Sequence, residues 1–532
     1  MENVKNAIVA MFDSWQFNYT GCYGSDFCKT PNIDKFAREG VLFENAYGNN
    51  MPTLPVRRSM MTGRYTLHEI GWGPLRLEDT TVADLCWGSG VDTAIAYNPQ
   101  VMFMNKGGFN RGFATCLFSR GYDNYHYCKD RLYPHHTPEE LYTDPGFLDR
   151  INASPDHKAV HGMMLKEVEL YLRDKQYWET EEDQPVHTNI MNAIEILERA
   201  DRNHSLLLWI DSWDPHEPWD PPSVWDPDMK CPYDPDYEGA DMWQPIGGTT
   251  AIYTEEQLHH IRMLFAEKIT LCDKYFGKLC RAIRKMGLWN NTLLWLTSDH
   301  GEPMGNGQWG HGIMEKCRPW PYEELVHIPL LIKFPGCPAN KRIKAFVQDC
   351  DCAPTLLAWL GLPIPKNMTG KNLIPLCMGE VDMVRDFAIA GYYKFSWSII
   401  TEDWSYIHWL NRLDGVSFGD GMAQIYTTPD AAITETGVEG GLNSNNSRTE
   451  AERKKIDIEN ESLATYKEHA TLDDEEQWTC NPGTKAELRS KDELYDRRND
   501  PWQLNNVIEQ HPDIASQLLT KLTDFMADLA EN

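Results

Sequence analysis

Three short apolar runs, each leading into an acidic residue, most constrain how this chain can fold. They cover residues 7–12 (AIVAMF), 206–210 (LLLWI) and 293–296 (LLWL), and they lead to Asp13, Asp211 and Asp299. Near-continuous apolar runs of this length are typical of strands that are buried on both faces of a sheet. Helical patterns such as residues 255–286 separate the runs. This alternation predicts an α/β domain with a mostly parallel sheet.

Histidines follow the second and third runs as well. His216 lies in DSWDPHEPW, and His300 and His311 lie in SDHGEPMGNGQWGHG. Ligands of parallel sheets bind beyond the carboxyl ends of the strands. We therefore expect these acids and histidines to form a metal site, and mixed histidine and carboxylate ligands suit Zn²⁺ or Mn²⁺.

Length and composition predict two parts. The chain has 532 residues, of which 42% are apolar, so a large core and a smaller second domain are expected. We place a catalytic α/β domain at residues 1–380 and a C-terminal subdomain at 381–532, with a long insertion at about 415–485.

The net charge of −29 argues against nucleic acid or an anionic membrane as a partner. No apolar run is long enough to span a membrane. The 14 cysteines and the absence of a signal-peptide pattern lead us to expect reduced thiols and a cytoplasmic location. A small anionic substrate would need cations in its binding site.

The segment MPTLPVRRSMMTGRY, residues 51–65, contains a candidate nucleophile. Pro55 suits a first helical turn, which would put Thr53 at a helix N-terminus, where amide donors and the helix dipole favour an anion. A metal beside the Thr53 hydroxyl would make it nucleophilic. Arg57 could clamp a tetrahedral oxyanion.

Together these segments resemble the sulfatase family of the alkaline phosphatase superfamily. TLPVRRSMMTGR is similar to the nucleophile signature of that family, and TSDHG to its second metal motif. PYEELVHIPLLIKFPG, DCAPTLLAWLGLP and ELYDRRNDPWQLNNV are similar to later family landmarks. The resemblance implies an alkaline-phosphatase-like fold, with a mostly parallel central sheet flanked by helices and a smaller C-terminal antiparallel sheet.

The sequence departs from the sulfatase pattern at several positions. Thr53 stands where sulfatases have a Cys or Ser that is oxidised to formylglycine, and Thr cannot yield that aldehyde by the same chemistry. Asp13-Ser14 replaces a pair of acids, and His311 stands where a Lys is expected. The family's Lys-x-His element is missing from AIAYNPQVMFMNKGG, where Asn98 and Lys106 become the substrate-binding candidates.

Relatives that process phosphate use a Thr or Ser between two metals, and phosphopentomutase-like members share two ligand spacings with this chain. Asp211 and His216 are five residues apart, and His300 and His311 are eleven apart. This similarity implies one metal at Asp211, His216 and His311, with Asp214 competing for the place of Asp211, and a second metal at Asp13, Asp299 and His300, with Thr53 facing both.

The leading hypothesis is therefore a hydrolase of phosphodiesters or phosphonate monoesters with Thr53, Arg57 and His216 as catalytic residues and two Zn²⁺ or Mn²⁺ ions. The alternative is a sulfatase that works without formylglycine and holds one Ca²⁺ or Mg²⁺. A mutase-type phosphotransferase and an inactive binding homologue are further alternatives. We expect a small anionic ester as substrate and a homo-oligomer, because related hydrolases often assemble through long C-terminal insertions.

Overall fold

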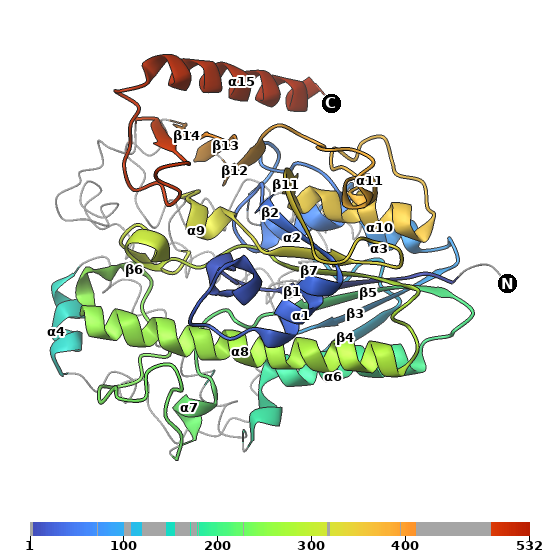
Figure 1. Cartoon of the computed structure of the whole chain (residues 1–532), viewed down its shortest axis with the longest axis horizontal. Helices are drawn as coiled ribbons and strands as arrows, with labels where there is room; N and C mark the ends of the chain where they lie inside the picture. Colours follow the sequence, from blue (N-terminus) through green and yellow to red (C-terminus); the bar gives the residue numbers. More distant parts are fainter. Residues whose placement is uncertain are drawn as a thin grey trace, which may run out of the picture.

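An eight-stranded sheet forms the centre of the molecule (Figure 1). The computed structural model describes residues 4–71, 73–99, 108–119, 145–154, 171, 178, 180–226, 228–316, 320–393, 395–410 and 491–531. The strand order is β11-β2-β10-β7-β1-β5-β3-β4, and only β10 runs antiparallel to its neighbours. The strands are β1 (Asn6–Phe12), β2 (Val41–Tyr47), β3 (Val91–Tyr97), β4 (Thr115–Phe118), β5 (Ser205–Ser212), β7 (Thr292–Ser298), β10 (Leu330–Lys333) and β11 (Lys341–Gln348).

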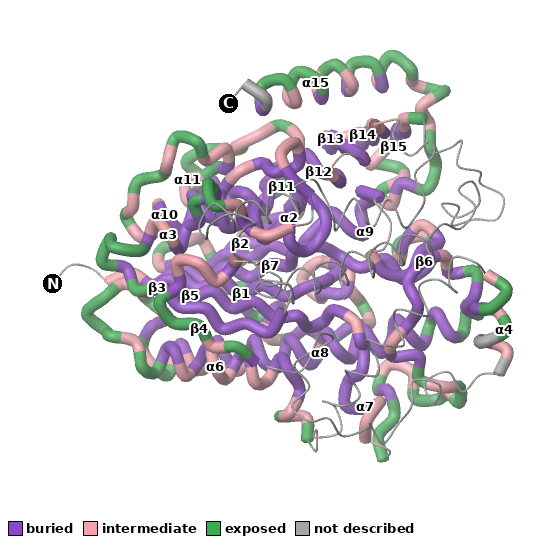
Figure 2. The backbone as a smooth tube through the Cα atoms, turned by 180° about the vertical axis from the view of Figure 1, so that it is seen from behind, coloured by how far each residue is buried: buried purple, intermediate pink, exposed green. Residues whose placement is uncertain are grey.

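Helices cover both faces of this sheet, so the central strands are buried on both sides, as the apolar runs predict (Figure 2). Alternate side chains of β1 enter different cores, since Ile8 packs in one hydrophobic cluster and Val9 in the other. The first cluster includes residues of α1 (Pro31–Glu39), α6 (Pro185–Arg199) and α8 (Glu255–Lys285). The second includes residues of α2 (Leu54–Thr62), α3 (Val82–Cys86), α10 (Cys352–Leu360) and α11 (Ile374–Met378).

A second, antiparallel sheet lies at the C-terminal end of the chain. Its strand order is β12-β13-β14-β15, with bounds Ala388–Tyr392, Ser396–Ile400, Trp404–Trp409 and Glu493–Asp496. Helix α15 (Pro512–Glu531) packs on this sheet, and its Leu518 and Leu522 join Ile399 and Tyr406 in one apolar cluster. The predicted fold class is thereby confirmed. The proposed insertion at residues 415–485 lies outside the described residues, and the boundary at residue 380 stays a prediction.

Small elements complete the described chain. They are α4 (Pro145–Ala153), α7 (Pro222–Trp225), α9 (Glu323–Val326) and a sheet of two-residue strands in the order β6-β9-β8 (Gly248–Thr249, Ile313–Met314, Met304–Gly305). Within the described residues, none of the helices combines the length and the apolar character that a membrane span requires.

The strand register brings the three predicted acids to one edge of the central sheet. Phe12 pairs with Ser212 of β5 and with Ser298 of β7, so the residues that follow these strands emerge side by side. Asp13 and Asp299 come directly after β1 and β7. Asp211 is the penultimate residue of β5 and points its carboxylate into the same region, where it meets Arg57.

Candidate active site

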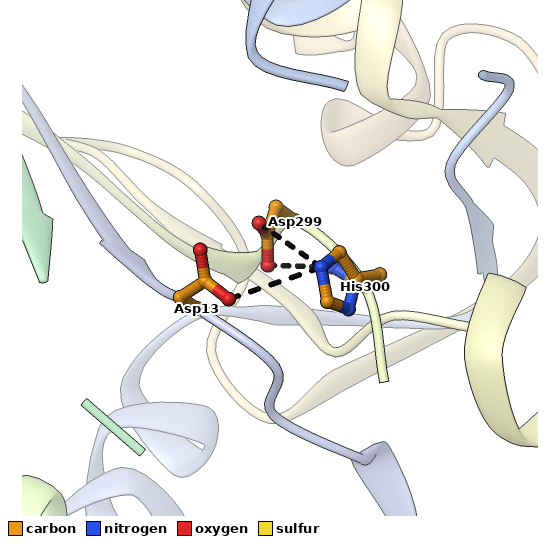
Figure 3. A group of neighbouring side chains, drawn as sticks. All are labelled: Asp13, Asp299 and His300. Atoms are coloured by element: carbon orange, nitrogen blue, oxygen red, sulfur yellow. Dashed lines mark hydrogen bonds and ion pairs between the residues drawn. The ribbon is translucent and has the colours of Figure 1, made fainter. Parts of the chain in front are cut away.

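Asp13, Asp299 and His300 form the one group of metal-ligand type within the described residues (Figure 3). Each can offer a ligand atom that lies within 4.8 Å of the other two, and all three side chains are buried. His300 Nε2 lies 3.8 Å from Asp13 Oδ1 and 3.5 Å from Asp299 Oδ2. The loops after β1 and β7 therefore converge on a space between two carboxylates and an imidazole.

The tautomer of His300 follows from its hydrogen bonds. Its Nδ1 lies 2.7 Å from the carbonyl oxygen of Gly301, which can only accept, so Nδ1 carries the proton. Burial lowers the pKa of His300 to about 4, so the ring is neutral near pH 7. The lone pair of Nε2 therefore faces Asp13 and Asp299, as a metal ligand requires.

Thr53 lies at the N-terminus of α2, as predicted, but its hydroxyl does not cap the helix. Its Oγ1 is fully buried and lies 3.0 Å from His300 Nε2. The backbone of Thr53 has φ +38° and ψ −83°, a conformation that β-branched residues rarely adopt. The hydroxyl thus faces the Asp13, Asp299 and His300 group instead of the helix amides.

Arg57 holds the three aspartates together. Its Nε and Nη2 donate to Asp211 at 3.0 and 2.7 Å, Nη2 also donates to Asp13 at 2.9 Å, and Nη1 donates to Asp299 at 2.6 Å. The last N–H, on Nη1, donates to the Thr53 carbonyl at 3.2 Å. All five donors of the guanidinium are used within the protein. Arg57 therefore positions the site, and the expectation that it clamps a substrate oxyanion does not match this geometry.

The charges of this cluster favour a divalent cation. Three fully buried aspartates form ion pairs with one guanidinium, which leaves this group of four side chains with a formal net charge of −2. Burial raises the pKa of Asp13 and of Asp211, because desolvation disfavours their charged forms. A dication held by Asp13, Asp299 and His300 would bring the cluster to neutrality, and two oxygens with one imidazole nitrogen suit such an ion.

The ligands expected for another metal do not come together. Both oxygens of Asp211 are bound by Arg57. His311 lies 2.7 Å from Glu324 through Nδ1 and 2.9 Å from the carbonyl of Gln503 through Nε2, so both ring nitrogens are engaged away from Asp211. Asp214, the competitor of Asp211, forms a buried ion pair with Lys268 at 2.9 Å.

Lys316 was not among the sequence candidates, and it is the residue that meets His216. Its Nζ lies 2.8 Å from His216 Nε2, 3.3 Å from Ser14 Oγ and 3.2 Å from both carboxylate oxygens of Glu217. Burial opposes the charge of Lys316, but Glu217 and then Glu302 raise its pKa well above the usual value. His311 does not reach His216, and a lysine five residues further along the chain lies beside His216 instead.

The other two predicted substrate-binding residues have different outcomes. Asn98 follows β3, is buried, and accepts a hydrogen bond from the Trp213 N–H at 2.6 Å. Within the described residues its Nδ2 has no acceptor, and its role in binding a substrate stays a prediction. Lys106 lies outside the described residues.

The ion pairs of Arg57 with Asp13, Asp211 and Asp299 predict a specific loss of stability. In the presence of a chelator, Arg57→Met should lower the free energy of unfolding by about 3 to 5 kcal/mol, because it removes the guanidinium that forms ion pairs with three buried carboxylates. Urea denaturation measures this change. The free energy of unfolding of Arg57→Lys should lie between the values of Arg57→Met and wild type, because an ammonium has three donors in place of five.

The control for this prediction is Arg199→Met, which breaks an exposed ion pair with Glu195 on α6. Exposed pairs of this kind contribute less than about 1 kcal/mol. An Arg57→Met protein that is as stable as Arg199→Met would contradict the role assigned to Arg57.

Comparison with known proteins shows the family and the fold. A sequence model of the family described as Sulfatase matches residues 5–362, and one described as N-sulphoglucosamine sulphohydrolase, C-terminal, matches residues 310–423. An N-acetylglucosamine-6-O-sulfatase of Bacteroides thetaiotaomicron is 23% identical over 476 residues, which cover 77% of this chain and 79% of that protein. The multifunctional alkaline phosphatase superfamily protein PehA of Trinickia caryophylli is 25% identical over 438 residues, which cover 70% of this chain and 76% of that protein.

Among solved structures, the phosphonate monoester hydrolase of Agrobacterium radiobacter superimposes with a TM-score of 0.61 at 19% identity, covering 99% of this chain and 96% of that one. This likeness shows a common fold. The family match extends over more than half of the chain and includes the whole Asp13, Thr53, Arg57, Asp299 and His300 region. The protein belongs to the sulfatase family of the alkaline phosphatase superfamily and is a hydrolase that acts on ester bonds.

Proposed function

We propose that this protein is a sulfatase-type hydrolase that uses one divalent cation and the Thr53 hydroxyl to cleave monoanionic sulfate esters. The observation that carries the proposal is that the described residues contain one metal-ligand cluster, Asp13, Asp299 and His300, whereas a two-metal phosphoesterase needs two such clusters. Arg57 and Lys316 lie among the side chains expected to form that second cluster. This arrangement favours the sulfatase alternative over the two-metal hypothesis.

The charge of the site supports a monoanionic substrate. Burial raises the pKa of Glu302 to about 8, so this carboxyl is mostly protonated near pH 7. The remaining acids are the three aspartates and Glu217, and they face Arg57 and Lys316. A dication would make the site neutral overall. A dianionic phosphate monoester would then be less well compensated than a sulfate ester, whose charge is −1.

The cation would supply the positive charge that favours the alkoxide form of a nearby hydroxyl. Thr53 first releases its hydroxyl proton to solvent and enters the cycle as the alkoxide. Its Oγ1 then attacks sulfur, the bond from sulfur to the ester oxygen breaks, and the leaving oxygen takes a proton from Lys316 Nζ. In the second step, Lys316 takes a proton from water as this water attacks sulfur and releases Thr53. The alcohol and hydrogen sulfate leave, and Thr53 and Lys316 return to their starting forms.

The surroundings of Lys316 fit this role. Burial and the neighbouring Lys316 charge lower the pKa of His216 well below its usual value, so His216 is neutral. Its Nδ1 lies 2.6 Å from the Glu217 carbonyl, which requires the proton on Nδ1 and leaves Nε2 to accept from Lys316. His216 thus orients the ammonium. The raised pKa of Lys316 matches a basic alkoxide leaving group better than an acidic phenol.

A second candidate substrate class is the phosphodiester or phosphonate monoester. Both carry one negative charge and so satisfy the same charge argument as a sulfate ester. The specific observation in their favour is Thr53 itself, because a Thr hydroxyl is a direct nucleophile whereas sulfatases carry a modified Cys or Ser at this position.

A substrate panel tests the proposal. With Mn²⁺ present, aryl sulfate, aryl phosphodiester, aryl phosphonate monoester and aryl phosphate monoester are compared by kcat/KM at one pH. We expect the sulfate ester to be the best substrate, with the dianionic phosphate monoester at least about 100-fold slower because of its extra charge. If only phosphorus esters turn over, the sulfatase proposal is wrong.

Thr53→Val is the matched variant for every substrate in this panel, because it keeps the branched shape and removes only the hydroxyl. It should reduce kcat by about 1,000-fold or more, whereas Thr53→Ser should keep measurable turnover. A Thr53→Val enzyme with wild-type kcat would remove Thr53 from the mechanism.

The role of Lys316 predicts a dependence on the leaving group. Lys316→Gln should slow an alkyl sulfate by about 100-fold or more, and a 4-nitrophenyl sulfate by less than about 10-fold, since nitrophenolate needs no proton to leave. Steady-state kinetics on the two esters measures the difference. Equal losses on both esters would show that Lys316 does not protonate the leaving oxygen.

A further inference from the structure

The backbone of Thr53 needs an external constraint. A β-branched residue at φ +38° and ψ −83° is strained, and such conformations persist only where the surroundings impose them. An ordinary N-cap threonine has extended backbone angles and bonds its Oγ to the N–H of the third helical residue, which here is Val56. In that relaxed state the Thr53 hydroxyl would leave His300. The loop of residues 48–52, which precedes Thr53, therefore decides where the hydroxyl points.

Asn49 is the most extensively bonded residue of this loop. It is fully buried, and its Nδ2 donates to Asp349 Oδ1 at 2.6 Å and also to Ser59 Oγ. Its Oδ1 accepts from the Thr66 N–H at 3.2 Å. A backbone N–H can only donate, so this contact fixes the orientation of the amide. Asn49 thus joins the loop to α2, to the segment after α2 and to the short 3-10 helix Asp349–Asp351.

One carboxylate oxygen of Asp349 accepts three hydrogen bonds. Its Oδ1 accepts from the backbone N–H of Asn49 at 3.2 Å, from Asn49 Nδ2 at 2.6 Å and from the Cys350 N–H at 2.8 Å. Its Oδ2 is buried without a hydrogen-bond partner within the described residues. Only one of the two oxygens therefore holds the loop.

Backbone bonds fix the loop at both ends. The Gly48 N–H donates to the Val326 carbonyl at 3.0 Å, and the Met51 N–H donates to the Gly391 carbonyl of β12 at 2.9 Å. Between these two anchors, the side chain of Asn49 is held from three sides. The chain therefore enters Thr53 from a fixed direction.

We propose that Asn49 and Asp349 are positioning residues, which impose the strained conformation of Thr53 and so keep its hydroxyl on the metal-ligand group. They act through the loop and touch neither the substrate nor the reacting atoms. The inference rests on the proposed role of Thr53 as nucleophile. Its structural part concerns the backbone of Thr53 alone and can be tested without turnover.

The test compares two substitutions at one position. Asp349→Asn keeps an oxygen that accepts the same three N–H groups, whereas Asp349→Ala removes it. In crystal structures, Thr53 should keep its positive φ in Asp349→Asn. In Asp349→Ala it should move to negative φ, with Oγ1 on the Val56 N–H and away from His300. A misplaced nucleophile should lower kcat by up to about 100-fold and leave KM within about two-fold.

Thr292→Val is the control for a purely structural loss. Thr292 is buried at the first residue of β7, at the far end of that strand from Asp299, and its Oγ1 donates to the Leu288 carbonyl at 2.7 Å. This variant should lose stability but keep both kcat and the conformation of Thr53. A fall in kcat as large as that of Asp349→Ala would mean that the effect is unspecific and would overturn the proposal.

The proposal is also overturned if Asp349→Ala keeps Thr53 at positive φ and in contact with His300. If Asp349→Ala does not fold, Ser59→Ala decides. It removes the bond that Ser59 Oγ accepts from Asn49 Nδ2, together with the bond that Ser59 Oγ donates to the Arg64 carbonyl at 2.7 Å. An unchanged Thr53 geometry in Ser59→Ala would then count against the proposal, and a shifted one would support it. Wild-type protein that cleaves none of the esters would refute the proposed function, while the crystallographic comparison would still decide this inference.

Discussion

The guanidinium of Arg57 lies where three parallel strands end, and the rest of the site depends on its bonds. Asp13, Asp211 and Asp299 come from β1, β5 and β7, and their carboxylates would repel one another in a buried space. Arg57 connects all three and also bonds the carbonyl of Thr53. One side chain therefore ties the N-terminus of α2 to the carboxyl edge of the sheet, in a geometry that an ammonium could not reproduce.

The same residue explains why the described residues place one metal-ligand group at this site. Asp211 reaches the edge where a second metal would lie, but Arg57 binds both of its oxygens. Beside it, the ammonium of Lys316 lies among His216, Ser14 and Glu217. Two fixed organic cations thus stand among the side chains that a second ion would require. In the proposed function, one dication would neutralise these acids, and a neutral site would suit an ester of charge −1.

Much of the fold and half of the site could be predicted from the sequence. Buried parallel strands expose their following residues at one edge, so Asp13, Asp299 and His300 were expected together, and they are. Asp211 was expected at the same edge, but strand patterns do not reveal whether a metal or an arginine binds a carboxylate. Arg57 was predicted to bind the substrate. The structure was needed to see that all five of its N–H groups bond within the protein.

The prediction of His311 as a metal ligand failed for a different reason. Spacing along the chain suggested a ligand eleven residues after His300, yet the turn around the β8-β9 pair directs His311 to Glu324 and to Gln503, 192 residues further along. A contact between such distant segments leaves no local pattern. Lys316 follows the same pair of strands, and the segment HGIMEK, residues 311–316, is the local signal that a lysine lies near this turn.

The number of metal ions tests this account most directly. Anomalous diffraction from crystals grown with Mn²⁺ should give one strong peak, bonded to Asp13, Asp299 and His300, with Arg57 still bound to Asp211. A second peak bonded to Asp211 or His216 would contradict the account, because Arg57 and Lys316 would then have to leave the positions on which the proposed chemistry depends.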